Sequence, residues 1–250
     1  MNNKTVGLVL GGGGAKGFAH LGVLKALEEK GISFDIISGV SAGAIVGVFL
    51  AAGKSVDEIM KLMKKNKFTD YAKVNLPVKG LMSLDNLKKN LEKHLSVREF
   101  KDLKYPFYVG VTDLKAGKID YLSEGSLIPA VQASSSIPVL FSPVKIEGTV
   151  YVDGGLIDNV PIKPLIDKCD KLIAINIMPL TESEKVDNLV DIAVRTFQLS
   201  VNAVNDELKE KCDLFIEPEG LEEYHILDTD HADELFEIGY NYAKDFEIEI

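Results

Sequence analysis

The sequence predicts an α/β protein built on a mostly parallel sheet, and three observations lead to that fold class. Residues 5–10 form a short apolar run rich in Val and Leu, typical of a buried strand, and four glycines end it. A helical pattern follows, and then a second short strand at residues 34–38 and an apolar helix at residues 42–52. Strands that alternate with helices in this way form parallel sheets covered by helices.

The rest of the chain continues the same alternation. Further strands are predicted at residues 106–112, 118–122, 149–152, 171–177 and 215–216, and further helices at residues 55–67, 84–91, 189–208 and 232–243. Ser55 and Glu58 have the spacing of a capping box, and Ser83 is expected to cap the helix that follows it. No repeat or linker interrupts the pattern. We therefore expect a single domain over residues 1–250, in which residues 181–250 supply the last helices and strand.

Composition and charge exclude several classes of protein. The 250 residues include 28 Lys or Arg and 38 Asp or Glu, which gives a net charge of −10. An acidic chain without basic stripes binds nucleic acid poorly, because phosphate contacts supply most of that affinity. The two cysteines, Cys169 and Cys212, are too few for a disulfide framework and lack zinc-ligand spacing. Without a legible export signal or the ~20 apolar residues of a membrane span, a cytoplasmic protein is expected, at most peripheral at a membrane.

Residues 39–43 carry the first chemical motif. They read Gly-Val-Ser-Ala-Gly and fit G-x-S-x-G, in which a serine sits on a sharp turn between a strand and a helix. Gly39 and Gly43 let this turn close, and the following helix directs its positive dipole end towards Ser41. The pattern predicts a nucleophilic serine. A glycine-flanked helix cap is the alternative, since Ser is also a favoured capping residue.

A glycine loop at residues 11–17 follows the first strand and begins the first helix. Its backbone N–H groups are expected to converge on an anion, which is a nucleotide phosphate, a dinucleotide pyrophosphate or the oxyanion of an acyl-transfer intermediate. A Walker motif is excluded because Gly17, and not Ser or Thr, follows Lys16. The loop does fit G-x-G-x-x-G. However, the second strand ends in the serine motif where a dinucleotide site needs an acidic residue.

A nucleophilic serine needs a base, and Asp153 is the first candidate. It ends a short strand, and Gly154 and Gly155 allow the turn that would present its carboxylate to the site. Burial would raise the pKa of this carboxyl and make it a stronger base. Two alternatives remain open at this point: Asp-Gly-Gly is a simple turn, or His225 or His231 completes a Ser-Asp-His triad in the chain order of an α/β-hydrolase.

Taken in order, these motifs resemble the patatin-like phospholipase family, in particular small bacterial members related to the neuropathy-target-esterase catalytic domain. The residues that carry the resemblance are GGG-x-KG at residues 12–17, G-x-S-x-G at residues 39–43 and Asp-Gly-Gly at residues 153–155. Residues 133–144 and 159–161 also match, so that the resemblance covers about residues 5–180.

The resemblance implies a three-layer α/β/α sandwich that hydrolyses acyl esters, typically phospholipids or lysophospholipids, without a metal or cofactor. It implies Ser41 as nucleophile and Asp153 as its partner in a Ser-Asp dyad. It also implies an oxyanion hole formed by Gly12, Gly13 and Gly14. The supporting motif residues are Lys16, Gly17, Gly39, Gly43, Gly154 and Gly155.

The sequence is also compatible with two other functions. One is a binding module that grips a nucleotide or acyl ligand without hydrolysis, and the other is the Ser-His-Asp esterase. The expected partner of the leading hypothesis is a lipid or fatty-acyl ester. The helix predicted at residues 55–67 either packs on the core with a solvated lysine face or uses Met60, Met63 and its lysines at a membrane surface. No pattern in the sequence sets the oligomeric state.

Overall fold

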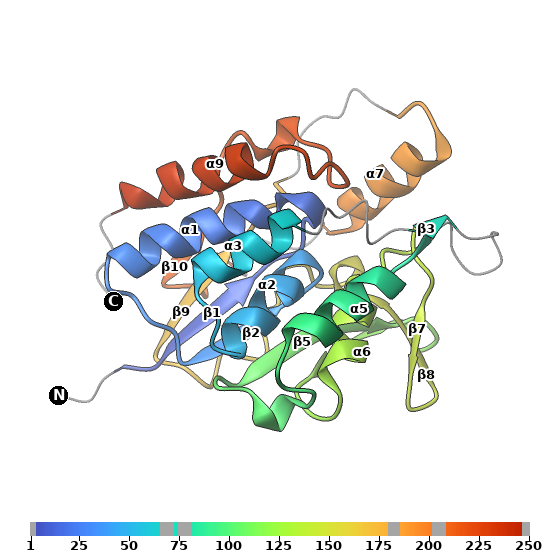
Figure 1. The fold of residues 1–250 in the computed structure, drawn as a ribbon, viewed down its shortest axis with the longest axis horizontal. Helices are drawn as coiled ribbons and strands as arrows, with labels where there is room; N and C mark the ends of the chain where they lie inside the picture. The colour runs from blue at the N-terminus through green and yellow to red at the C-terminus, as the bar shows by residue number, and fades with distance from the viewer. Residues whose placement is uncertain (1–3, 66–72, 75–81, 180–185, 202–208, 247–250) are drawn as a thin grey trace.

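A central sheet organises the fold in the computed structural model, which describes residues 4–65, 73–74, 82–179, 186–201 and 209–246 (Figure 1). The strand order is β10-β9-β1-β2-β5-β8-β7, and β6 pairs with β5. The pairs that join β10, β9, β1, β2 and β5 are parallel, whereas β6, β7 and β8 are antiparallel to their neighbours. The strands of this sheet are β1 Val6–Leu10, β2 Ile36–Gly39, β5 Phe107–Asp113, β6 Lys118–Leu122, β7 Val144–Ile146, β8 Thr149–Asp153, β9 Lys171–Ile175 and β10 Leu214–Ile216.

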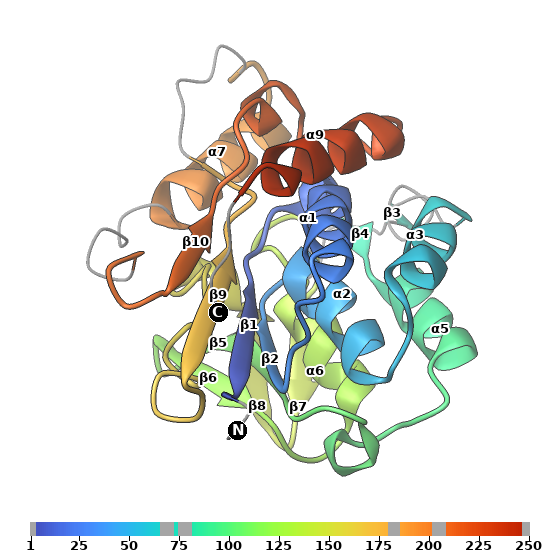
Figure 2. The same ribbon diagram turned by 90° about the vertical axis from the view of Figure 1, so that its left-hand side faces the viewer.

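Helices surround this sheet, which confirms the predicted fold class of a mixed α/β protein with a mostly parallel sheet. Helices α1, α2 and α6 lie next to the sheet, and α3, α5 and α9 lie outside them (Figure 2). The helices are α1 Gly17–Glu29, α2 Ala42–Ala51, α3 Val56–Lys65, α5 Asp85–His94, α6 Leu127–Ser134, α7 Leu189–Val201 and α9 Ala232–Lys244. Short 3-10 turns are η1 Gly14–Lys16, η2 Phe100–Asp102, η3 Gly154–Leu156 and η4 Leu221–Glu223, and β3 Lys73–Val74 pairs separately with β4 Met82–Ser83.

The central strand β1 is buried on both faces, as expected for the interior of a parallel sheet. Leu8 and Leu10 belong to the main apolar core beneath the helices. Val9 points to the other side, where Val160 and Ile162 pack against it. The uniformly apolar sequence of β1 therefore reflects the two apolar environments on the two faces of the sheet.

One of the two predicted helix N-termini differs in the structure. Helix α5 begins at Asp85 with Leu84 as its N-cap, while Ser83 ends strand β4, so the prediction that Ser83 caps this helix is wrong. The predicted capping box at α3 is confirmed, because the Ser55 amide donates to the Glu58 carboxylate at 2.9 Å. Residues 66–67 and 202–208 of the predicted helices lie outside the described residues. None of the described helices has the length and apolar character needed to cross a membrane.

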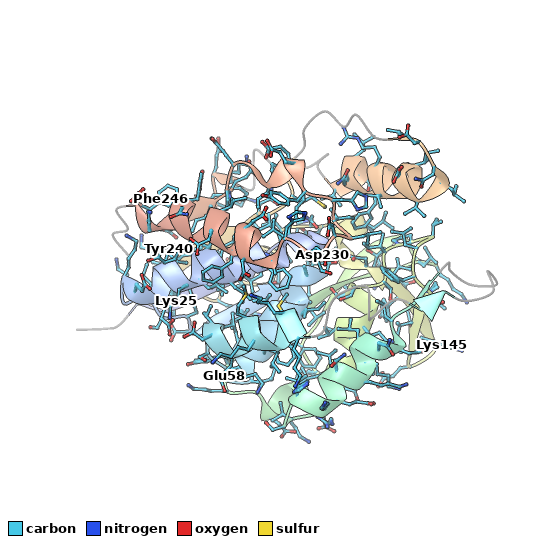
Figure 3. All side chains as sticks on the ribbon, turned by 45° about the horizontal axis from the view of Figure 1, so that its top comes forward. Lys25, Glu58, Lys145, Asp230, Tyr240 and Phe246 are labelled. Atoms are coloured by element: carbon cyan, nitrogen blue, oxygen red, sulfur yellow. The ribbon has the colours of Figure 1, made fainter. Side chains whose placement is uncertain are left out.

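The C-terminal part of the chain joins the same structure. Strand β10 pairs with β9, and α9 packs along α1. Figure 3 shows Tyr240 on the side of α9 that faces α1, and its hydroxyl donates to Glu29 at 2.7 Å. The two helices approach closely at Gly22 and Gly239, where a side chain would collide with the backbone of the partner helix.

Replacement of Gly239 by Ala tests this close approach. A Cβ at this position would lie 2.2 Å from the Ala19 carbonyl oxygen, so α9 must move away from α1. We expect a loss of about 1–3 kcal/mol in the free energy of unfolding, measured by chemical denaturation. Glu237→Ala, at an exposed position of α9, is the control. Equal stability of the two variants would contradict the packing described here.

Candidate active site

Ser41 lies at a strained turn between β2 and α2. Its backbone angles are φ 51° and ψ −120°, a region that residues with a side chain rarely occupy. The flanking glycines are needed for steric reasons. A Cβ on Gly39 would lie 2.6 Å from the Gly43 carbonyl oxygen, and a Cβ on Gly43 would lie 2.1 Å from the Leu10 carbonyl oxygen. The G-x-S-x-G pattern thus allows α2 to pack directly against the end of β1.

A second serine, Ser134, holds this turn in place. The Ser41 amide donates to the Ser134 hydroxyl at 2.9 Å, and that hydroxyl donates to the Gly110 carbonyl at 2.7 Å. Ser134 ends helix α6 and is fully buried. It connects the turn after β2 to strand β5. No pattern in the sequence marks Ser134, because its role depends on contacts with segments far away in the chain.

Asp153 reaches the same edge of the sheet through the antiparallel strand β8. Gly39 pairs with Val109 on β5, and Asp153 pairs with Val111, two residues further along that strand. Strand β5 therefore extends beyond the end of β2, and β8 runs back along this extension towards Ser41. The Asp153 amide donates to the Ser136 carbonyl at 2.9 Å, which fixes the end of β8.

The Asp153 carboxyl group is fully buried. Burial raises its pKa from 3.8 to about 7, while interactions with the Ser41 hydroxyl and the Gly155 amide act in the opposite direction. Oδ1 accepts the Gly155 amide at 2.8 Å. Within the described part of the chain, Oδ2 has no partner with ordinary hydrogen-bond geometry. The Ser41 hydroxyl is therefore near enough to lower the pKa of Asp153, although the structure shows no hydrogen bond of ordinary geometry between the two side chains.

The glycine loop passes beside Ser41. A Cβ on Gly12 would lie 3.2 Å from the Ser41 Cβ. The Gly12 amide is already engaged, since it donates to the Asn159 backbone carbonyl at 3.1 Å, and the Asn159 side-chain amide donates back to the Gly12 carbonyl at 3.4 Å. The amides of Gly13 and Gly14 make no hydrogen bond with any part of the chain that the structure describes. Free donors are therefore found at Gly13 and Gly14, whereas Gly12 was expected to contribute as well.

A segment near the C-terminus supports this loop, although the sequence showed no motif there. The Ala15 amide donates to the Ile226 carbonyl at 2.7 Å. Gly14 has a φ of 59°, and a Cβ on it would lie 2.2 Å from the same carbonyl oxygen. Thr229, three residues further on, lines the cavity beside Ser41. Residues far apart in the sequence thus complete the site.

Two buried ionisable side chains lie in or near the loop. Burial lowers the pKa of Lys16 to about 8, with the charge of Glu222 acting in the opposite direction. Burial also lowers the pKa of His20 to about 4, against a raising effect of its hydrogen bond with the backbone of Gly11. That bond joins Nε2 of His20 to the Gly11 carbonyl oxygen at 2.8 Å, so a neutral His20 donates from Nε2. This hydrogen bond from His20 therefore stabilises the start of the glycine loop.

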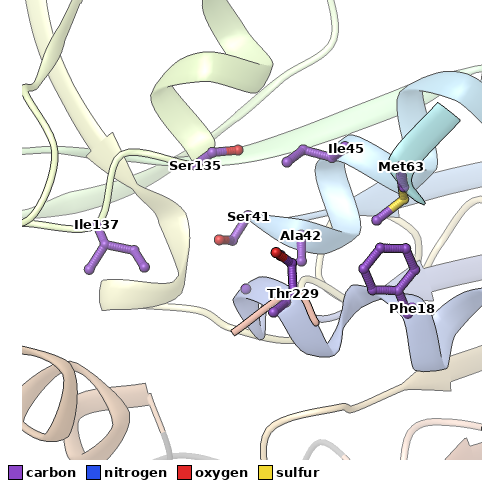
Figure 4. A pocket seen from close by; sticks show the side chains of 10 residues that line it. Phe18, Ser41, Ala42, Ile45, Met63, Ser135, Ile137 and Thr229 are labelled. Atoms are coloured by element: carbon purple, nitrogen blue, oxygen red, sulfur yellow. The ribbon is translucent and has the colours of Figure 1, made fainter. Parts of the chain in front are cut away.

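A largely apolar cavity of about 40 Å³ opens beside the Ser41 side chain (Figure 4). The residues that line it are Gly14, Ala15, Phe18, Ser41, Ala42, Ile45, Met63, Ser135, Ile137 and Thr229. In Figure 4, Ile137 lies on one side of Ser41, and Phe18, Ile45 and Met63 lie on the other. Such a lining suits an alkyl chain better than a phosphate or a nucleotide base.

The two histidines of the alternative triad do not line this cavity. His225 is exposed, and its Nδ1 accepts the Leu227 amide at 3.2 Å. His231 interacts with Glu234 at 3.2 Å, which raises its pKa. Among the described residues, no group of three or more His, Cys, Asp or Glu side chains is placed to hold a metal ion.

A strained serine turn beside a glycine loop, on a mostly parallel α/β sheet, is the arrangement of the serine-hydrolase class. Within this class, the model of the patatin-like phospholipase family matches residues 8–166. The chain belongs to the patatin-like phospholipase family, a family of lipid-hydrolysing enzymes.

Curated relatives match almost the whole chain. Lysophospholipase NTE1 of Scheffersomyces stipitis is 27% identical over 276 aligned positions, which cover 97% of this chain and 18% of that protein. Lysophospholipase NTE1 of Saccharomyces cerevisiae is 26% identical and covers 98% of this chain and 17% of its own length. This chain therefore spans less than a fifth of the length of these relatives.

A solved structure shares the fold. The crystal structure of VipD from Legionella pneumophila superposes with a TM-score of 0.63 and 18% identity, covering 96% of this chain and 66% of that one. The match extends beyond residue 166, so the C-terminal strand and helix belong to the common architecture as well.

Replacement of Asp153 by Asn tests the burial of this carboxyl group through stability. A folded-state pKa of about 7 means that the folded protein holds a proton between about pH 3.8 and 7 that the unfolded chain has released. This contribution to stability is fully present below pH 3.8 and is lost as the pH rises through 7. We expect Asp153→Asn to gain several degrees in melting temperature over the wild type between about pH 5 and pH 8.

Asp167→Asn is the matched control for this experiment, because Asp167 is exposed. Its difference in melting temperature from the wild type should be the same at both pH values. If the Asp153→Asn difference is equally independent of pH, the carboxyl group is not buried as described.

Proposed function

We propose that the protein is a serine acyl-ester hydrolase that uses Ser41 as nucleophile and Asp153 as general base. The single observation that carries this proposal is the buried Asp153 carboxyl group next to the strained Ser41 turn. Its pKa of about 7 suits a base that must accept a proton near neutral pH. A simple Asp-Gly-Gly turn would leave this carboxylate in solvent.

The geometry of the site supports a two-step reaction through an acyl-enzyme. Ser41 Oγ attacks the ester carbonyl carbon while its proton passes to Asp153, and the amides of Gly13 and Gly14 donate to the oxyanion that forms. Collapse of this intermediate expels the alcohol, which takes the proton from Asp153. A water molecule then attacks the acyl-enzyme while Asp153 takes its proton, and Asp153 returns this proton to Ser41 Oγ as the fatty acid leaves. Loss of one oxyanion donor typically costs a factor of about 10²–10³ in rate.

The cavity supports a fatty-acyl substrate, because apolar side chains form most of its wall. The lysophospholipase names of the relatives favour a lysophospholipid or phospholipid as the natural ester. The proposed contact with a membrane surface has weaker support. Lys61 and Lys65 of α3 are exposed, but Lys64 forms an ion pair with Asp233 at 2.7 Å. This contact and the cytoplasmic location stay predictions.

The two alternative functions have less support. A nucleotide-binding module would place a base and a phosphate in a cavity whose lining is mainly apolar. A histidine-dependent esterase would need His225 or His231 near Ser41, where neither lines the cavity. Each alternative predicts results that differ from those of a Ser-Asp dyad when the same set of variants is assayed.

Substitution of the proposed dyad tests the function directly. We expect Ser41→Ala and Asp153→Asn each to lower kcat on p-nitrophenyl butyrate and on lysophosphatidylcholine by about 10³-fold or more. The two side chains act together in the same step, so that loss of either one disables it. A fluorophosphonate probe should label the wild type at Ser41 and fail to label Ser41→Ala. His225→Ala and His231→Ala should keep wild-type activity.

Wild-type turnover by Ser41→Ala would rule out the proposed hydrolase. Loss of activity in either histidine variant, with Asp153→Asn still active, would favour the histidine-dependent reaction. Stabilisation by a dinucleotide without any labelling of Ser41 would favour the binding module.

The pH dependence of the reaction tests the role of Asp153. Only the ionised carboxylate accepts the Ser41 proton, and the pKa of Asp153 is about 7. We expect kcat/KM to rise with pH through about 7 and then to level off, measured with a neutral ester. A rise centred near pH 4 would mean that Asp153 is a solvated carboxylate, which contradicts the proposal.

A further inference from the structure

Two cavities of the structure share part of their walls. The first lies beside Ser41, and the second lies between helices α2, α3 and α5. Ile45 of α2 and Met63 of α3 line both of them. The other residues that line the second cavity are Phe49, Leu62, Leu87, Asn90, Leu91 and His94.

Ile45 and Met63 are placed to control passage from one cavity to the other. Ile45 lies in the first turn of α2, where its amide donates to the Ser41 carbonyl at 3.1 Å, and both residues line the first cavity. The Met63 methyl group approaches the first turn of α1, at 3.6 Å from a Cβ built on Gly17. Figure 4 shows Ile45 and Met63 next to each other on one side of Ser41.

The two side chains differ in conformational flexibility. Ile45 is branched at Cβ and is therefore stiff. Met63 has a flexible thioether, which moves through several rotamers at little cost. Both side chains are only partly buried, so neither is fixed by tight packing on all sides. A movable side chain opposite a stiff one is suited to a narrow passage that an alkyl chain can open.

The second cavity has the chemistry of an alkyl-chain site. Phe49, Leu87 and Leu91 are buried and apolar, and Leu62 is half-buried. Its volume is about 20 Å³, against about 40 Å³ for the first cavity. A water-sized group needs about 10–15 Å³ by this measure, so each cavity holds only a few methylene groups. A long acyl chain bound at Ser41 must therefore extend beyond the first cavity, and the second cavity adjoins it at Ile45 and Met63.

We propose that the acyl chain of the substrate runs from Ser41 between Ile45 and Met63 into the second cavity, and that these two side chains set the acyl-chain length that the enzyme accepts. This inference rests on the proposed function and adds the substrate's chain length to it. Chains that end before the passage bind in the first cavity alone. Longer chains must displace Met63 and gain the apolar contacts of α5.

The test compares the ratio of kcat/KM for p-nitrophenyl dodecanoate to that for p-nitrophenyl butyrate among variants. Met63→Ala and Ile45→Ala widen the passage and are expected to raise this ratio about tenfold, the usual value of a small change in an apolar pocket. Leu62→Phe fills the second cavity from a position that does not line the first, and should lower the ratio about tenfold.

Met60→Ala is the matched control, because Met60 is a half-buried methionine of the same helix that lines neither cavity. Its ratio should equal that of the wild type. A Ser41-dependent esterase whose ratio is unchanged in Met63→Ala, Ile45→Ala and Leu62→Phe would overturn the passage and leave the proposed function intact. If no variant and no wild-type sample cleaves either ester, the proposed function fails and the passage fails with it. A ratio that shifts equally in Met60→Ala would show a general effect of α3 and would also overturn the passage.

Discussion

The buried Asp153 carboxyl group is the constraint on which the site depends. Removal of a carboxylate from water is costly, and no cation among the described residues offsets that cost at this position. The pKa therefore rises to about 7, and the group exchanges protons near neutral pH. The same burial that destabilises the charged form keeps the carboxylate beside Ser41 out of contact with solvent. Stability and chemistry are thus opposed at this residue, as is common in active sites.

Backbone approach explains why the motifs around this carboxyl group are rich in glycine. A Cβ on Gly154 would lie 2.3 Å from the Gly110 carbonyl oxygen, which is where β8 returns along β5. Gly43 brings α2 against the end of β1, and Gly12 lets the loop pass Ser41. Three separate segments of chain can therefore meet at one edge of the sheet. These glycines matter because they lack a side chain, so that the backbone segments can approach closely. This close approach sets the position of the amides of Gly13 and Gly14.

The alternation of strands and helices predicted the fold class, because apolar periodicity and glycine breaks are local signals. The same local signals predicted Ser41, Asp153 and the loop as candidates. Contributions that depend on tertiary contact could not be predicted. Ser134 acts through the Ser41 amide, the Asn159 carbonyl occupies the Gly12 amide, and Ile226 supports the loop from more than 200 residues away. Ser83 was misplaced as a cap because a short strand, which no periodicity reveals, ends at that residue.

The most direct measurement is the ionisation of the Asp153 carboxyl group itself. Infrared difference spectra of the wild type minus Asp153→Asn, recorded across a pH titration, isolate the carboxyl band of this one residue. We expect a transition from the protonated to the ionised carboxyl near pH 7, as burial requires. We also expect Ser41→Ala to move this transition upwards, because the hydroxyl lowers the pKa. A transition near pH 3.8 that does not respond to Ser41→Ala would mean that Asp153 is a solvated carboxylate without influence from Ser41.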